Sequence, residues 1–175
     1  MTDKELNTLI DLLTSRPKPP NPTPEMLRER FDKLADFLPT PGDIQSEPVT
    51  ANGVAGEFIS APGADPTRCI YYLHGGGYVI GNVNTHRVLA YDLSKASGAR
   101  VLSMDYGLAP EHPFPAGLED AVKGYQWLLA SGVQPEHTVI AGDSAGGGLA
   151  VATLLALRDR GIALPAAAVC FSPWV

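Results

Sequence analysis

The sequence predicts an α/β fold with a mostly parallel sheet flanked by helices and preceded by an N-terminal helical cap segment. Three observations lead to this prediction: β-rich apolar runs alternate with helical runs after residue 69, glycines follow those helical runs, and a tight-turn dipeptide precedes them. Such alternation requires crossover helices on the faces of a parallel sheet. We assign residues 1–42 to the cap segment and residues 43–175 to the main domain.

The cap segment is predicted to hold two helices joined by a Pro-rich linker, because the prolines between Arg16 and Pro24 exclude regular structure. Thr23 can cap the second helix, and Pro24 suits its first position. Apolar residues then recur on one helical face, at Met26, Leu27, Phe31, Leu34 and Leu38. Since such a stripe has to be covered, we interpret the segment as a lid over the main body.

The main domain begins with short β-like runs over residues 44–60, around Asn52-Gly53, a dipeptide typical of a tight hairpin turn. We therefore expect an antiparallel edge there. Further strands are expected at 69–73, 100–104, 138–141 and 166–171, and helices at 85–96, 116–130 and 145–160. Gly98, Gly132 and Gly161 follow the helices, where a left-handed cap residue belongs.

Composition excludes several classes of protein. The net charge of −6 and the lack of a Lys/Arg run argue against nucleic-acid binding, which needs a cationic surface. No apolar stretch approaches the roughly 20 residues that cross a bilayer, and the N-terminus lacks the pattern of a signal peptide. We expect a cytoplasmic protein with no membrane or nucleic-acid partner. Cys69 and Cys170 are expected to be reduced core residues.

A short motif, Gly142-Asp143-Ser144-Ala145-Gly146, lies between an apolar strand and a helix rich in Ala and Leu. A serine in a tight strand-to-helix turn needs small neighbours, because the strained backbone leaves no room for side chains. The amides at a helix N-terminus favour developing negative charge. We predict that Ser144 is a catalytic nucleophile, and that Asp143 has a structural role, hydrogen bonding to nearby loops.

A glycine run upstream follows the predicted strand 69–73 directly, as His74-Gly75-Gly76-Gly77-Tyr78. Consecutive glycines are entropically costly, so the bare backbone must be needed. We predict an oxyanion hole formed by the amides of Gly75, Gly76 and Ala145, with His74 orienting the loop. A phosphate-binding loop would need a Lys followed by Ser or Thr, and a dinucleotide site would need a different glycine spacing; neither pattern occurs here.

Together these motifs resemble the hormone-sensitive-lipase family of α/β-hydrolases, also called bacterial family IV esterases. The resemblance rests on residues 74–78, on Asp105-Tyr106 with residues 108–116, and on residues 142–147. It implies a serine carboxylesterase that acts on small-molecule esters, of short to medium acyl chain, through an acyl-enzyme on Ser144. It implies no cofactor and no metal, and a possible homodimer in the full-length protein. Gly107 replaces the family's usual Arg, so we expect a looser loop there.

The acid and histidine of the catalytic triad are expected beyond residue 175, together with the C-terminal strands, because this fold orders its triad as serine, acid, histidine. The histidines present are His74, His86, His112 and His137, and none has the right topological position. We expect surface roles for His86 and His137 and a structural hydrogen bond for His112. Our hypothesis is that residues 43–175 are the N-terminal part of the catalytic domain of a longer enzyme, and that this chain alone is inactive.

Two other functions stay open at this point. An amidase or peptidase would share the same elbow and oxyanion hole. A non-catalytic small-ligand receptor of the same fold, as in the plant gibberellin receptors, would keep the fold and lose the triad. A histidine on the last loop of the full chain would discriminate an enzyme from a receptor.

Overall fold

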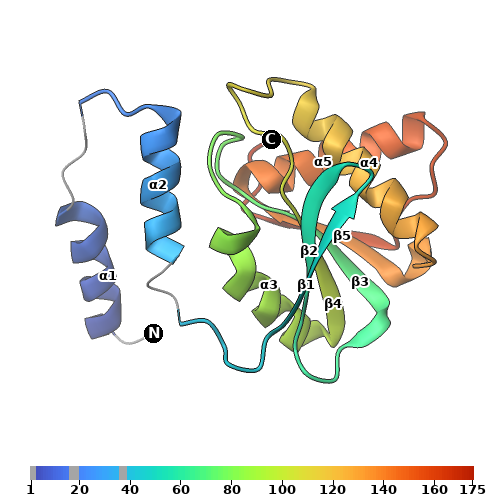
Figure 1. Ribbon diagram of the computed structural model, residues 1–175, viewed down its shortest axis with the longest axis horizontal. Helices are drawn as coiled ribbons and strands as arrows, with labels where there is room; N and C mark the ends of the chain where they lie inside the picture. The colour runs from blue at the N-terminus through green and yellow to red at the C-terminus, as the bar shows by residue number, and fades with distance from the viewer. Residues whose placement is uncertain (1–2, 16–19, 36–38) are drawn as a thin grey trace.

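The computed structural model describes residues 3–15, 20–35 and 39–175 (Figure 1). Its helices are α1 (Asp3–Ser15), α2 (Pro24–Ala35), α3 (Val83–Ser97), α4 (Ala116–Ala130) and α5 (Ser144–Asp159), with a short 3₁₀ turn at Pro135–His137. Its strands are β1 (Gln45–Ala51), β2 (Val54–Ser60), β3 (Asp65–Leu73), β4 (Ala99–Met104), β5 (Thr138–Asp143) and β6 (Ala167–Phe171).

The strands form one sheet in the order β1-β2-β4-β3-β5-β6. β1 and β2 form the predicted antiparallel hairpin, with Asn52 and Gly53 at φ 50° and 87° in its turn. β2 pairs antiparallel with β4, whereas β4, β3, β5 and β6 run parallel to their neighbours. A helix lies between each pair of consecutive parallel strands, which confirms the predicted α/β class.

Helices cover both faces of the sheet. Alternate residues of β3 point to opposite faces, so Tyr71 packs with α4 and α5 while Tyr72 packs with α3. Tyr71 and Tyr72 are both fully buried. Burial of a large apolar side chain contributes roughly 1.5–3 kcal/mol, so packing on both faces stabilises the sheet.

The helix ends follow the capping signals in the sequence. Gly98, Gly132 and Gly161 have φ of 69°, 98° and 65°, as predicted for residues that follow a helix. α3 begins two residues earlier than predicted because Asn82 and Thr85 form a capping box, in which each side chain bonds to the backbone of the other residue.

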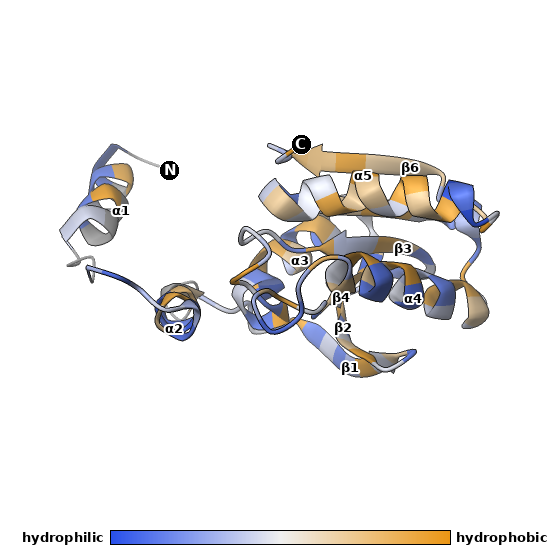
Figure 2. Ribbon diagram, turned by 90° about the horizontal axis from the view of Figure 1, so that it is seen from above, coloured by the Kyte–Doolittle hydropathy of each residue, from blue (hydrophilic) through white to orange (hydrophobic). Residues whose placement is uncertain are grey.

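The N-terminal helices lie beside the body that carries the sheet. The hydroxyl of Thr23 accepts a hydrogen bond from the amide of Met26 at 3.4 Å, as predicted for the cap of α2. On the apolar stripe, Phe31 contacts the ring of His86, whereas Met26 and Leu27 are exposed. Leu38 lies outside the described residues. Figures 1 and 2 both show α1 standing apart from the sheet, so any lid closure by it stays a prediction.

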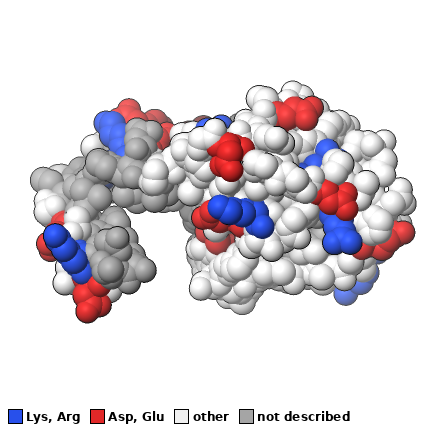
Figure 3. Space-filling view, turned by 90° about the horizontal axis from the view of Figure 1, so that it is seen from below, with Lys and Arg blue, Asp and Glu red and all other residues white. Residues whose placement is uncertain are grey.

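Charges of both signs are mixed on the face shown in Figure 3, with no continuous basic patch. Within the described part of the chain, no helix has both the length and the apolar character needed to span a bilayer. The predicted free cysteines are Cys69, which is buried, and Cys170, which is half-buried.

The strand register places the three sequence motifs at one edge of the sheet. Leu73 at the end of β3 pairs with Met104 at the end of β4 and with Gly142 near the end of β5. Because parallel strands end at the same edge, the glycine loop after β3, the loop after β4 and the turn at Ser144 lie close together.

Candidate active site

The turn at Ser144 joins β5 to α5 with a backbone that L-residues rarely adopt, since Ser144 has φ 50°. Holding such a residue costs about 1–3 kcal/mol. Its glycine neighbours are required by close backbone approach. A Cβ on Gly142 would lie 2.6 Å from the carbonyl oxygen of Leu73, and a Cβ on Gly146 would lie 2.6 Å from the carbonyl carbon of His74. The local chain therefore fits the predicted nucleophile turn.

Asp143 ties this turn to the glycine loop. Its Oδ1 accepts hydrogen bonds from the amide of Gly75 at 2.8 Å and from the hydroxyl of Tyr72 at 2.6 Å, and it lies 3.7 Å from Nε2 of His86. Burial raises the pKa of Asp143, but the interactions with His86, Tyr72 and Gly75 outweigh it and lower the pKa to about 2. Asp143 is thus an ionised organiser of the loops, the structural role expected from the sequence.

His74 lies at the start of the glycine loop and is fully buried. Its ring stacks on Tyr106 with a centroid distance of 4.5 Å and on His86 with one of 5.3 Å. Burial lowers the pKa of His74 to about 4, so the ring is neutral at pH 7. Nδ1 lies 2.8 Å from the carbonyl oxygen of Gly75, which can only accept, so Nδ1 carries the proton.

The prediction for Gly75 needs a correction. Its N–H is already donated to Asp143, so it is not available to an oxyanion. Within the described residues, the amides of Gly76 and Gly77 make no hydrogen bond, and the amide of Ala145 belongs to the first turn of α5, which has no partner within the helix. Gly76 and Gly77 have φ of 125° and 63°. The free donors at this edge are therefore Gly76, Gly77 and Ala145.

The prediction that His86 has a surface role is wrong. His86 is only 7% exposed, and its Nδ1 lies 2.9 Å from the hydroxyl of Thr85. The other ring nitrogen faces Asp143. No local pattern marks this burial, because the ring packs against His74 and Tyr72 from a different part of the chain. His137 is exposed, as expected.

His112 is also exposed, and its own amide donates a hydrogen bond to the carbonyl of Leu108 at 2.8 Å. Its side chain makes no hydrogen bond within the described residues, so the expected structural bond comes from the backbone instead. No described histidine hydrogen-bonds to the hydroxyl of Ser144. The described residues thus contain the turn and the donors but no base in contact with the serine.

Arg28 of α2, which the sequence analysis missed, connects the cap segment to both loops. Its guanidinium donates to the carbonyls of Val79 and Ala109 at 2.8 and 2.9 Å and forms a two-pronged pair with Glu111. The hydrogen bonds from Arg28 lower the pKa of Glu111 to about 2. No local pattern marks this residue, because its partners lie 51 to 83 positions away.

The loop at Gly107 is well held, in contrast to the looser loop expected there. The amide of Gly107 donates to Asp120 at 3.0 Å, and a Cβ at this position would lie 2.9 Å from Cβ of His112. The close contact with His112 leaves little space for a larger residue without a shift of that side chain.

Comparison with known proteins shows which family this chain belongs to. A family model described as the α/β-hydrolase fold matches residues 70–175. An esterase from the bacterial hormone-sensitive-lipase family superimposes on all of this chain with a TM-score of 0.94 and 48% identity, the chain covering 59% of that structure. The chain belongs to the hormone-sensitive-lipase family of α/β-hydrolases. The fold and the resemblance predicted from the three motifs are thereby confirmed.

Relatives that are similar to this chain in sequence are named for ester hydrolysis. An acetyl-hydrolase of Streptomyces hygroscopicus is 42% identical over 99% of this chain and 58% of its own length. An esterase of Acinetobacter venetianus is 36% identical over 96% of this chain and 55% of its own length. The chain thus spans a little over half the length of these relatives.

Across residues 3–15, 20–35 and 39–175, no three His, Cys, Asp or Glu side chains gather as a metal centre would require. What the described residues do assemble is a strained serine, an ionised aspartate that fixes the glycine loop, and backbone donors at the N-terminus of α5.

Proposed function

We propose that this chain carries the nucleophile and the oxyanion hole of a carboxylesterase, with Ser144 as the attacking residue. The observation that supports it best is the turn at Ser144, strained at φ 50° and tied through Asp143 to the glycine loop. Acyl transfer needs a nucleophile and prealigned donors within one site, and these residues lie at one edge of the sheet.

The proposed reaction follows from the placement of these groups. Ser144 attacks the ester carbonyl, and the oxygen that becomes negative is held by the amides of Gly76, Gly77 and Ala145. The alcohol leaves, and water then hydrolyses the acyl-enzyme. A general base has to take the serine proton, and we propose that an acid and a histidine from outside residues 1–175 supply it.

We further propose that the acyl group is of short to medium length. An apolar cavity of about 360 Å³ is lined by Tyr78, which follows the glycine loop, and by Leu149 and Ala152 of α5. A cavity of this size has room for a short or medium hydrocarbon group, and ligand sites are characteristically apolar hollows of this kind. A small-molecule ester is thus the proposed substrate.

A fluorophosphonate probe tests the proposal, because it phosphonylates activated serines and leaves ordinary ones unmodified. The protein that carries this chain in the cell would be purified, treated with the probe, digested and analysed by mass spectrometry. We expect one adduct, on the peptide that contains Ser144, and none in the Ser144→Ala variant. Hydrolysis of p-nitrophenyl butyrate should disappear in the same variant.

The oxyanion assignment has its own readout. Gly77→Ala, where a Cβ meets open space but φ is 63°, should strain and shift the glycine loop and so lower kcat with a smaller change in KM. Gly63→Ala, in open space with φ 81° and outside the glycine loop, is the matched control and should change neither. An adduct on another residue would refute Ser144 as nucleophile. A folded protein that binds butyrate esters without labelling or turnover would instead be a small-ligand receptor, and an amide substrate cleaved faster than its ester would make it an amidase.

A further inference from the structure

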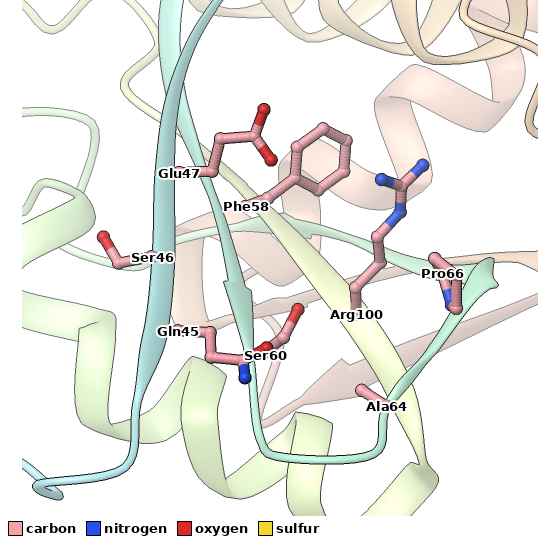
Figure 4. Close-up of a pocket in the computed structure, with 8 residues that line it drawn as sticks. All are labelled: Gln45, Ser46, Glu47, Phe58, Ser60, Ala64, Pro66 and Arg100. Carbon is pink, nitrogen blue, oxygen red and sulfur yellow. The ribbon is translucent and has the colours of Figure 1, made fainter.

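A second cavity, of about 490 Å³, is lined by the residues drawn in Figure 4. Its walls come from β1, β2, the segment after β2 and the starts of β3 and β4. Ser144 follows the carboxyl end of β5, which runs parallel to β4 within the sheet, whereas Arg100 is the second residue of β4. The cavity is therefore separate from the proposed active site.

Arg100 is the unusual group in this cavity. Its Nε is buried and has no hydrogen-bond partner, and within the described residues its guanidinium forms no ion pair. A buried donor without an acceptor is destabilising unless something supplies the acceptor. Within the described residues the guanidinium thus has no protein anion beside it, and its terminal Nη groups are the donors that a ligand in the cavity would meet.

Phe58 fixes the plane of this guanidinium. The central carbon of Arg100 lies 4.0 Å from the centroid of the Phe58 ring, and the ring is 8% exposed. Stacking on an aromatic face restricts the rotation of an arginine and leaves the edge with its N–H groups free. Arg100 is thus preorganised to donate along its edge.

The surroundings select the kind of anion. A carboxylate matches the planar fork of arginine with two parallel hydrogen bonds. Glu47 pairs with Phe58 across β1 and β2 and stands on the other side of the ring from Arg100, so its charge disfavours a dianion such as phosphate. Ala64 and Pro66 add apolar wall for a short hydrocarbon tail.

We propose that this cavity binds a short-chain monocarboxylate, with Arg100 as its anchor. Ester hydrolysis releases such an acid, and the identification of the ligand as a reaction product rests on the function proposed above. The binding site itself follows from Arg100, Phe58 and Glu47 and does not depend on Ser144.

Sodium butyrate is the probe for an NMR titration of the ¹⁵N-labelled protein that carries this chain, with sodium chloride at equal ionic strength as the blank. We expect a saturable shift of the Arg100 Nε–H signal and of nearby amides in β1 and β2. Arg100→Met should weaken binding at least tenfold, and Arg100→Lys should weaken it less, because lysine keeps the charge and loses the fork. Arg158→Met, at an exposed arginine, is the matched control.

Each further outcome decides between alternatives. Ser144→Ala should leave butyrate binding unchanged, and loss of binding in that variant would place the ligand at the active site and refute this proposal. Tighter binding of inorganic phosphate than of butyrate would refute the carboxylate class. Glu47→Gln should tighten butyrate binding. If butyrate bound only in Glu47→Gln, Glu47 itself would be the partner of Arg100, and the proposal would fail.

The test also separates this site from the proposed function. Butyrate binding at Arg100 with no phosphonylation of Ser144 would leave the site standing and remove only its interpretation as a product site. The NMR spectrum reports directly whether each variant is folded, and Arg100→Lys keeps the test valid if Arg100→Met unfolds.

Discussion

Replacing Asp143 by Asn tests the central element of the site, the carboxylate that joins the serine turn to the glycine loop. The pKa of Asp143 falls from its ordinary value of 3.8 to about 2 in the folded protein. At 1.36 kcal/mol per pKa unit, this shift corresponds to about 2 kcal/mol of stability at neutral pH. Asp143→Asn should therefore lower the free energy of unfolding at pH 7 by about this amount.

The sign of the pH effect follows from the depressed pKa. Asp143 contributes its full stabilisation above the unfolded pKa near 4 and loses it as the pH falls through the folded pKa near 2. The wild-type protein should lose about 1 kcal/mol more than Asp143→Asn between pH 5 and pH 3. The remaining carboxylates titrate in both proteins, so their contributions cancel in this difference.

Urea unfolding followed by tryptophan fluorescence at several pH values measures both effects. Asp92→Asn, at an exposed aspartate on α3, is the control with the same change of charge, and it should behave as the wild type does. The reasoning is refuted if Asp143→Asn loses as much stability between pH 5 and pH 3 as the wild type, because the carboxylate would then not have the depressed pKa.

Further variants and reagents test the packing around this edge. Gly146→Ala should cost at least about 3 kcal/mol in urea unfolding, because its Cβ meets backbone that has no room to shift, whereas Gly42→Ala, in open space, should stay within about 0.5 kcal/mol of the wild type. Arg28→Met should speed amide hydrogen exchange in α2 at least tenfold, since the helix loses hydrogen bonds to both loops; unchanged exchange would mean that packing alone holds α2. Burial raises the pKa of the Cys69 thiol to about 12. At pH 8 iodoacetamide should therefore modify half-buried Cys170 first, and a second adduct, on Cys69, should appear only after unfolding. Early modification of Cys69 would contradict its burial.

The local pattern of the sequence determined the elements and the position of the serine. Strand, turn and helix around Ser144 follow from apolar runs and glycines within a few residues of one another. The hairpin at Asn52-Gly53 and the glycines after the helices are likewise set by backbone dihedrals that only a few residue types adopt. These features could be predicted because their causes are adjacent in the chain.

Only the tertiary structure decided which amides and side chains the site can use. Gly75 and Asp143 are 68 positions apart, and their hydrogen bond exists because strand register brings the ends of β3 and β5 together. The burial of His86 and the contacts of Arg28 arise in the same way. A hydrogen bond between distant residues depends on register and packing, which no local spacing records. For that reason the sequence did not reveal that the amide of Gly75 is already donated to Asp143.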